Sequence, residues 1–555
     1  MAKTSKPTRG SASKPGATKR PAKASPKSAP ARAKASARSA APAKKAPAKQ
    51  APAKATSRAA TSRAATSRVA APTPAPSDKS RPLVAIASPT ASSPLLRSLT
   101  VDEQRAVRLA LAGKAALLSC APRARDPLVF AAAASVAAAP VVVASPHAAE
   151  LLAQAVALPG IDVIGLGAFA SAAEAAGKRR LARGGSLLVV IEPAQLFNTE
   201  LRQLFAKAPP ALLGIAAAHA SSEHAHELCA AYLSLREAVK AFSVSVLATC
   251  TKTSARVIEQ VAETLGASAA SVIARAEVEL TRSAQVVRAG ERKAALFALI
   301  AARGGPGVVL TATPQEADGV FAELAARHIP SVRAHSGMSL EERNATLARF
   351  AEPRERLVLV AQSPHANASG LAGCPEANQV LSSAPPRRDL SFVVHYQAPL
   401  SPEQHFEDVA WLPEGGHSLV LADSSDAALV QALLAQQRVK PAAVEAVAQA
   451  LAQAPNDRPI FSDTLALRAG TSRRSAERVL SAFADRSLIT RDSGQIARRV
   501  TPEQLSAEGR LLAARFATLR AGDVGRAELV ASYVTSRHAS TTSAAAGPSL
   551  QQVRA

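Results

Sequence analysis

Short apolar runs alternate with longer alanine- and leucine-rich segments between about residues 96 and 430. Runs of four to eight apolar residues without polar alternation are typical of strands buried on both faces of a parallel sheet. The longer segments between them have the length and composition of helices. The pattern therefore predicts an α/β fold with parallel sheets. The strands are expected at 115–120, 139–145, 186–192, 211–216, 244–249, 306–312, 356–361, 390–396 and 417–423.

A stretch with a weaker hydrophobic pattern, 266–290, separates two groups of predicted strands. We predict a hinge there, between a first lobe at 93–270 and a second lobe at 271–436. The uncharged stretch from Leu128 to Ala144 approaches the length of a membrane span, but it is rich in alanine and interrupted by Pro140. A buried helix followed by a strand explains this stretch better, so we expect no membrane partner.

A third unit is predicted at 437–500, where the pattern changes to helix, turn, helix and two short strands. The helical stretch SDTLALRAG ends at Gly470, RRSAERVLSAFADRSL forms the next helix, and ITRDSGQIARRV has the pattern strand, tight turn, strand. This order is typical of a winged helix, and 501–555 is expected to be a helical segment with a disordered tail. Such a unit can place its second helix in a DNA groove, or it can dock a protein. The side chains expected to meet DNA are Ser472, Arg473, Arg474, Ser475 and Arg478.

Positive charge is concentrated near the N-terminus. The formal net charge is +25, and residues 1–80 hold nineteen Lys and Arg against one acid, Asp78, which leaves +7 for the rest of the chain. Residues 1–92 consist mainly of Lys, Ala, Pro and Ser, a composition that favours disorder. A basic arm of this kind binds DNA through phosphates without reading sequence, and Lys44 and Lys45 are among the expected contacts. The alternative is a solubilising linker.

The four cysteines, Cys120, Cys229, Cys250 and Cys374, are scattered along the chain. No C-x-x-C pair is present that would clamp a zinc ion or close a short disulfide loop. The opening residues, MAKTSKPTRGSASK, also lack the apolar core of a secretory signal. We therefore expect a protein of the reducing cytoplasm.

Several segments follow, in order, the pattern of one known family. SLTVDEQRAV at 98–107, VVVASPHAAELLAQAV at 141–156 and IEPAQL at 191–196 lie in the first lobe. In the second lobe, 307–350 retains His335, Gly337, Arg343 and Phe350, and it is followed by FVVHYQAPLSPEQHFED at 392–408. In these segments the chain resembles the RecQ family of superfamily 2 ATP-dependent DNA helicases.

The resemblance implies two RecA-like lobes of the P-loop NTPase fold, a winged helix and DNA as a partner. It places Gln104 at the position where the family reads adenine, as a vestigial nucleotide contact. The family's zinc-binding cysteine cluster is absent, so the unit at 437–500 resembles the family's winged helix in kind only.

The residues that bind and hydrolyse ATP in the family are replaced at three places. The phosphate loop is APRARDP at 121–127, without glycine and with Asp126 and Pro127 at the Lys and Ser/Thr positions. Arg123 or Arg125 could attract phosphate by charge, but neither stands at the lysine position. The DEAH box is Ala216, Ala217, Ala218 and His219, and the arginine-finger positions hold Trp411 and Glu414. We therefore expect neither ATP nor Mg²⁺ as a cofactor, and no ATP turnover.

Other polar residues have simpler explanations. His219, His224 and His226 have the spacing of a metal site, but they fall on the segment that the resemblance assigns to the family's coupling loop, so we expect no metal. Trp411 is expected to be a core residue. The acids at 223, 227 and 407 are expected on a solvated surface. Arg387 and Arg388, in the insertion at 370–389, are weaker candidates for DNA contact.

These observations predict a RecQ-helicase-like DNA-binding protein of the bacterial nucleoid, without ATP hydrolysis, that acts as a scaffold or accessory factor in DNA repair or recombination. Two alternatives stay open. One is an active ATP-dependent 3′–5′ DNA helicase with a divergent ATP site. The other is a protein-interaction scaffold that its basic tail tethers to DNA.

Overall fold

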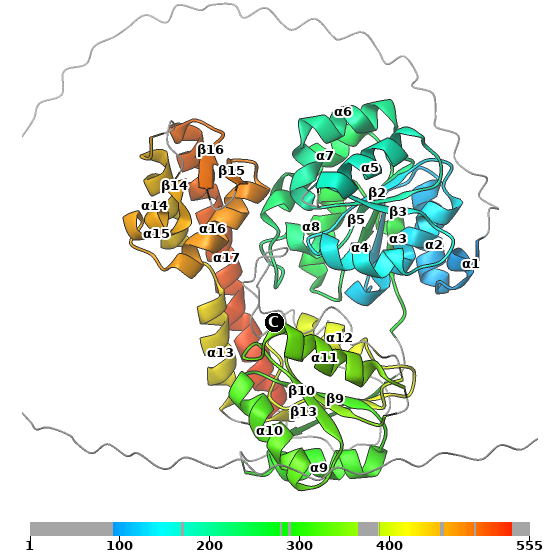
Figure 1. The fold of residues 1–555 in the computed structure, drawn as a ribbon, viewed down its shortest axis with the longest axis vertical. Helices are drawn as coiled ribbons and strands as arrows, with labels where there is room; N and C mark the ends of the chain where they lie inside the picture. Colours follow the sequence, from blue (N-terminus) through cyan, green and yellow to red (C-terminus); the bar gives the residue numbers. More distant parts are fainter. Residues whose placement is uncertain are drawn as a thin grey trace, which may run out of the picture. The chain divides into compact units, whose positions relative to one another are not determined.

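The structure, a computed structural model, is shown in Figure 1. It describes residues 93–535, apart from 168–170, 278–279, 287–289, 354, 364–386, 388, 424, 456–459 and 493–494. The described chain contains two parallel sheets, each covered by helices on both faces, and a smaller antiparallel sheet within a helical unit.

The first sheet has seven parallel strands in the order β3-β4-β2-β5-β6-β1-β7. Every residue of its central strands is buried, which is why these strands are apolar except for Ser119 at the end of β1 and Thr249 at the end of β6. The strands are β1 (Ala116–Ser119), β2 (Val141–Ala144), β3 (Val163–Leu166), β4 (Leu188–Ile191), β5 (Leu212–Ile215), β6 (Val246–Thr249) and β7 (Val272–Ala274).

Two hydrophobic clusters cover the two faces of this sheet. One face packs against α1 (Pro94–Arg97), α2 (Val101–Leu111), α3 (Asp126–Val136) and α4 (Ala148–Val156). The other packs against α5 (Ser171–Ala182), α6 (Thr199–Lys207), α7 (Leu235–Phe242) and α8 (Ala255–Leu265). The helix α3 is almost wholly apolar because it lies between the sheet and its neighbours α1, α2 and α4.

The second sheet has six parallel strands in the order β10-β11-β9-β12-β13-β8. The strands are β8 (Thr281–Val286), β9 (Gly307–Thr311), β10 (Ser331–Ala334), β11 (Val358–Gln362), β12 (Phe392–His395) and β13 (His417–Ala422). The helices α9 (Arg292–Arg303) and α10 (Pro314–Ala326) pack on one face, and α11 (Leu340–Ala351) packs on the other; α12 (Pro402–Val409) follows β12.

All nine strands predicted from apolar runs are present, and the predicted fold of two parallel-sheet lobes is confirmed. Four further strands of these sheets were not predicted: β3, β7, β8 and β10. Each of them lies at the edge of its sheet. The stretch 266–290, predicted as a hinge, supplies an edge strand to each sheet, so only the residues between β7 and β8 are left to connect the sheets.

The C-terminal unit is mainly helical. Its three-stranded antiparallel sheet has the order β14-β16-β15, and one hydrophobic cluster joins this sheet with α14, α15, α16 and α17, whereas α13 packs in a cluster with residues of the second lobe. The elements are α13 (Asp426–Gln437), α14 (Pro441–Ala452), β14 (Ile460–Phe461), α15 (Ser462–Arg468), α16 (Arg473–Asp485), β15 (Ile489–Asp492), β16 (Gln495–Arg498) and α17 (Pro502–Thr535).

Within the described ranges, no helix combines the length and the apolar character that crossing a lipid bilayer requires.

Candidate functional site

The carboxyl ends of the first sheet's strands define the candidate site. In an open parallel sheet, ligands bind in the crevice outside these ends. The segments that follow β1, β2, β5 and β6 all leave the sheet at this edge, and α3 begins there. This arrangement brings together residues from 120–127, 145–147 and 216–227, which are far apart in the sequence.

The turn between β1 and α3 carries an acid at the position where the RecQ resemblance places the phosphate-binding lysine. After β1 the chain forms a 3₁₀ turn at Arg123–Arg125, and α3 begins at Asp126 with Pro127 next. A helix N-terminus attracts anions through its exposed N–H groups, but Pro127 has none to offer. Asp126 is 4% exposed, so an internal carboxyl group occupies this end of the helix.

Burial raises the pKa of Asp126 well above its usual range, although a hydrogen bond with Thr249 opposes the shift. The stability linked to this group is therefore fully present below the unfolded pKa and is lost as pH rises through the folded pKa. We expect Asp126→Asn to become increasingly stable relative to the wild type between pH 4 and pH 8, by on the order of 2 kcal/mol.

Urea unfolding of the Asp126→Asn variant and the wild type at several pH values measures this difference. Asp162→Asn is the matched control, because Asp162 is an exposed acid of the same lobe. Its stability difference from the wild type should not grow with pH in the same way. An Asp126→Asn difference that stays constant from pH 4 to pH 8 would contradict the assignment of a costly buried carboxyl group.

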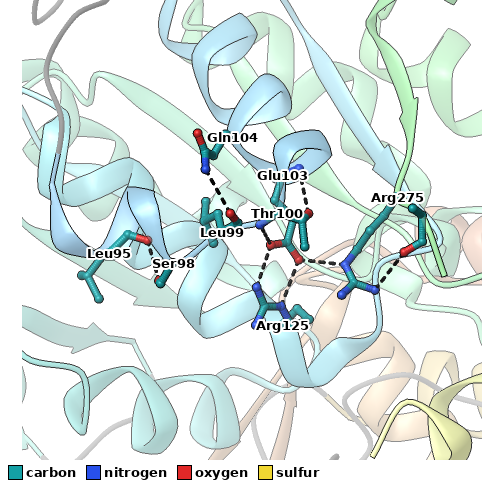
Figure 2. A network of polar contacts seen from close by, with 9 residues as sticks. Leu95, Ser98, Leu99, Thr100, Glu103, Gln104, Arg125 and Arg275 are labelled. Atoms are coloured by element: carbon teal, nitrogen blue, oxygen red, sulfur yellow. Dashed lines mark hydrogen bonds and ion pairs between the residues drawn. The ribbon is translucent and has the colours of Figure 1, made fainter. Parts of the chain in front are cut away.

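Arg125, which could attract phosphate, is instead held by an internal acid (Figure 2). Its Nε and Nη2 atoms lie 2.9 and 2.6 Å from the two carboxylate oxygens of Glu103. Arg275 donates from Nε to the same carboxylate at 2.9 Å, and the Thr100 backbone N–H donates to it at 2.9 Å. The Glu103 side chain is completely buried. One carboxylate thus joins the start of α2, the turn before α3 and the segment after β7.

The charge of Glu103 is stabilised within this network. Burial would raise its pKa, but the hydrogen bond and charge of Arg125, with Thr100 and Arg275, lower it on balance. Glu103 was not among the predicted site residues, although TVDE at 100–103 is a capping-box sequence. The structure confirms that capping box, in which Thr100 accepts from the Glu103 N–H.

Gln104, at the predicted adenine-reading position, lies next to this network. Its side-chain amide donates to the backbone carbonyl of Leu99 at 3.0 Å (Figure 2). The side chain is half-buried and therefore engaged by the chain itself. A nucleotide that used this amide as a donor would compete with the Leu99 carbonyl.

Arg123 is also paired internally. Its guanidinium lies 3.3 Å from the Glu227 carboxylate, and its backbone N–H donates to Glu407 at 2.9 Å. Burial would lower the pKa of Arg123, but Glu227 and Glu407 raise it on balance. The expectation that these acids lie on a solvated surface was wrong: Glu227 and Glu407 are both buried, because each one binds Arg123. Both arginines of the turn are thus engaged by internal carboxylates.

The segment after β5 has no carboxylate at the positions that hold Mg²⁺ in the RecQ family. Ala216 and Ala217 are buried, and Ala217 has a left-handed backbone with φ of 51°. The Tyr232 hydroxyl lies 2.9 Å from the carbonyl oxygens of both Ala144 and Ala216, which ties the ends of β2 and β5 together. Methyl groups cannot ligate a cation or activate water.

The two arginine-finger positions have different surroundings. Trp411 is 4% exposed and belongs to the hydrophobic cluster on one face of the second sheet, as expected of a core residue. Glu414 is exposed in the turn before β13. Neither side chain can supply the positive charge that stabilises a transferring phosphoryl group.

The residues at and near α16 that were predicted to contact DNA differ in how exposed they are. Ser472 caps the helix by accepting from the Ser475 N–H, Arg473 and Arg474 are exposed, and Arg473 lies 3.0 Å from Asp463. The prediction for Arg478 was wrong. This residue is 5% exposed and donates to the Gln437 carbonyl at 2.9 Å, because it lies on the packed side of α16, one turn before the buried Ala482.

The prediction for Arg387 was also wrong. Its side chain is buried and binds Asp389 at 2.7 Å and the backbone carbonyls that follow α11, including those of Glu352 and Glu355. The guanidinium therefore holds the second lobe together and does not face a phosphate. The candidates Arg388, Lys44 and Lys45 lie outside the described residues.

The three histidines after β5 do not act as one group. His219 and His226 are buried with their rings stacked at a centroid distance of 5.4 Å. His224 is half-buried and is not part of the cluster that includes these two rings. Glu227 was not among the metal-site residues considered from the sequence, but its carboxylate lies beside both buried histidines.

No protein-family model and no curated protein matches the chain. Among solved structures, the chain is similar to a DEAD box protein from the hyperthermophile Methanococcus jannaschii, at 13% identity and a TM-score of 0.40, over 61% of this chain and 92% of that one. It is also similar to the Mycobacterium smegmatis helicase Lhr bound to ssDNA and AMP-PNP, at 15% identity and a TM-score of 0.40, over 75% and 63% of the two chains. A third similar structure is the DUF1998 helicase MrfA bound to DNA, at 12% identity and a TM-score of 0.43, over 74% and 60%.

Proposed function

We propose that the chain is a RecQ-helicase-like DNA-binding protein that does not hydrolyse ATP. It is a pseudoenzyme that acts as a DNA-bound scaffold or accessory factor in DNA repair or recombination, in the bacterial nucleoid. The observation that carries the proposal is the chemistry at the carboxyl edge of the first sheet. There the anion position holds Asp126, the metal positions hold alanines, and both nearby arginines bind internal carboxylates.

Two features of the chain support DNA as the partner. The N-terminal arm carries nineteen basic residues within residues 1–80 and one acid, enough to neutralise many phosphates. The unit formed by α15, α16 and the β15–β16 hairpin has the element order of a winged helix and exposes Arg473 and Arg474 at the start of its second helix. The ion pair of Arg473 with Asp463 is exposed, so DNA can replace it at little cost.

The double variant Arg473→Ala, Arg474→Ala tests the role of α16. We expect it to lower the affinity for the preferred DNA structure by about tenfold, because base and phosphate contacts at a helix N-terminus each contribute about 1 kcal/mol or more. The log–log salt slope should fall by about two units if both side chains contact phosphates. Fluorescence anisotropy with duplex, forked and single-stranded DNA measures both quantities.

Arg327→Ala, Arg349→Ala is the matched control, since it removes the same charge from partly exposed arginines of the second lobe. The control should retain the DNA preference of the wild type. Equal losses in the two double variants would mean that α16 contributes only net charge. Unchanged binding in both would remove α16 from the DNA-binding surface.

A further inference from the structure

A group of buried side chains that could ligate a metal ion lies at the same edge of the first sheet, and the proposed function uses it only through the pairing of Glu227 with Arg123. His219 follows β5, and His226 and Glu227 lie in the next turns of the same segment. One ligand atom from each of these residues lies within 4.8 Å of the other two. All three side chains are buried. His147, the residue before α4, approaches the same carboxylate, with its Nε2 atom 3.9 Å from Glu227 Oε2.

Within the described part of the chain, the ring of His219 is buried without hydrogen bonds, which a bound ligand could provide. Its side chain is 2% exposed, and neither ring nitrogen has a hydrogen-bond partner among the described residues. A buried polar atom without a partner costs about 1–3 kcal/mol, so such atoms mark places where an ion or water belongs. Burial lowers the pKa of His219 to about 4, so the ring is neutral at pH 7. The neutral imidazole is the form that binds metal ions.

The spacing suits a small divalent ion. Ligand atoms around tetrahedral zinc lie about 3.3 Å apart, given bonds of about 2.0–2.1 Å to nitrogen and oxygen. Side-chain rotations that draw these groups together by about 1.5 Å would close the site. The Nε2 atom of His147 is buried and lies 3.9 Å from Glu227 Oε2, so this ring stands next to the three grouped residues and can supply a fourth ligand.

The surrounding charges also suit a cation. Arg123 contributes one positive charge, and the charges of Glu227, Glu407 and Glu150 each raise its pKa. Arg123 Nη2 lies 3.3 Å from Glu227 Oε2 and 3.5 Å from Oε1, and Oε1 lies 3.7 Å from His226 Nε2. Carboxylates that ligate metal ions are themselves hydrogen-bonded by outer-shell groups, and Arg123 is such a donor to Glu227. The acids exceed the single arginine, so a divalent ion would bring the cluster closer to neutrality.

We propose that His219, His226 and Glu227, with His147 as the fourth ligand, bind one divalent transition-metal ion of the zinc type. Four protein ligands leave no open position for water or substrate, so the site is structural. The ion would fasten the segment after β5 to the start of α4. The inference shares Glu227 with the proposed function, which uses the pairing of Glu227 with Arg123, but zinc binding is measured separately from DNA binding and ATP turnover.

Zinc titration of the full-length chain tests the proposal. The protein is stripped with a chelator, and Zn²⁺ is added in a calorimeter. We expect one equivalent to bind, with the affinity reduced at least about 100-fold in His219→Gln and in His226→Gln. His224→Gln is the matched control, because it removes a neighbouring histidine that lies outside the cluster, and its affinity should equal that of the wild type. Zinc should also raise the melting temperature of the wild type and not that of His219→Gln.

Co²⁺ substitution keeps the test informative if a glutamine variant fails to fold. The wild-type Co²⁺ complex should show the intense visible bands of a tetrahedral ion without a thiolate-to-metal charge-transfer band. A charge-transfer band would assign the ion to cysteine and overturn the proposal. Absence of stoichiometric zinc binding by the wild type would overturn it, as would equal affinity in the wild type and in folded His219→Gln and His226→Gln.

Discussion

Replacing Glu103 with alanine is expected to lower the free energy of unfolding by about 3–5 kcal/mol. The substitution leaves two guanidinium groups, those of Arg125 and Arg275, without their shared carboxylate in a mostly buried environment. It also removes the side chain that accepts the Thr100 N–H at the start of α2. Unfolding in urea, followed by circular dichroism, measures the loss.

The control for this prediction is Glu342→Ala. Glu342 occupies the same position in the capping box of α11, where it accepts from the Ser339 N–H, but it is exposed. Removing the Glu342 carboxylate should lower the free energy of unfolding only slightly, because water can take over its hydrogen bond. Glu103→Gln keeps the shape of the side chain and the hydrogen bond to Thr100. Its loss of unfolding free energy should therefore fall between those of Glu103→Ala and Glu342→Ala. A Glu103→Ala variant no less stable than Glu342→Ala would show that the buried network does not stabilise the lobe.

Deleting residues 1–92 is expected to weaken DNA binding by at least about 100-fold at 50 mM salt. Residues 1–80 hold nineteen of the basic side chains, and each phosphate contact contributes about 0.9 to the log–log salt slope. The loss should be the same for every DNA sequence, because phosphate contacts carry no base information. The difference between the two proteins should shrink as salt rises.

Anisotropy titrations at four salt concentrations measure both the affinity and the slope. Lys44→Ala, Lys45→Ala is a graded control, since it removes two charges and should lower the slope by no more than about two units. A deletion variant with the salt slope of the full chain would exclude the basic arm as the main DNA anchor. A sequence-dependent loss would show that the arm makes base contacts.

The central part of the fold was predictable because the strands of a parallel sheet covered on both faces are mostly apolar, which leaves short apolar runs in the sequence. The four strands that were not predicted in these sheets lack that signal. β8 has the sequence TRSAQV, and β10 alternates half-buried and buried residues, as edge strands can. An edge strand needs only one neighbour and can carry polar residues.

The replacements at the positions where the RecQ resemblance places ATP-binding residues were visible in the sequence, because each lies within a short recognisable segment. The contacts that these replacing residues and their neighbours make were not visible. Arg275 is 172 positions from Glu103, and the spacing of residues along a chain gives no information on such a pair. The orientation of Arg478 was missed for a different reason: RRSAERVL does not reveal which arginine lies on the packed side of its helix. Packing against Gln437 decides that.

The proposed function requires that the carboxyl edge of the first sheet cannot hold a nucleotide and its magnesium ion. Calorimetric titration of Mg·ATP into the full chain, with and without single-stranded DNA, tests this most directly. We predict no stoichiometric binding, a dissociation constant weaker than about 1 mM, and no DNA-stimulated release of phosphate. One-to-one binding at micromolar concentration that is lost in Gln104→Ala would contradict the account and would favour an active helicase with a rearranged site.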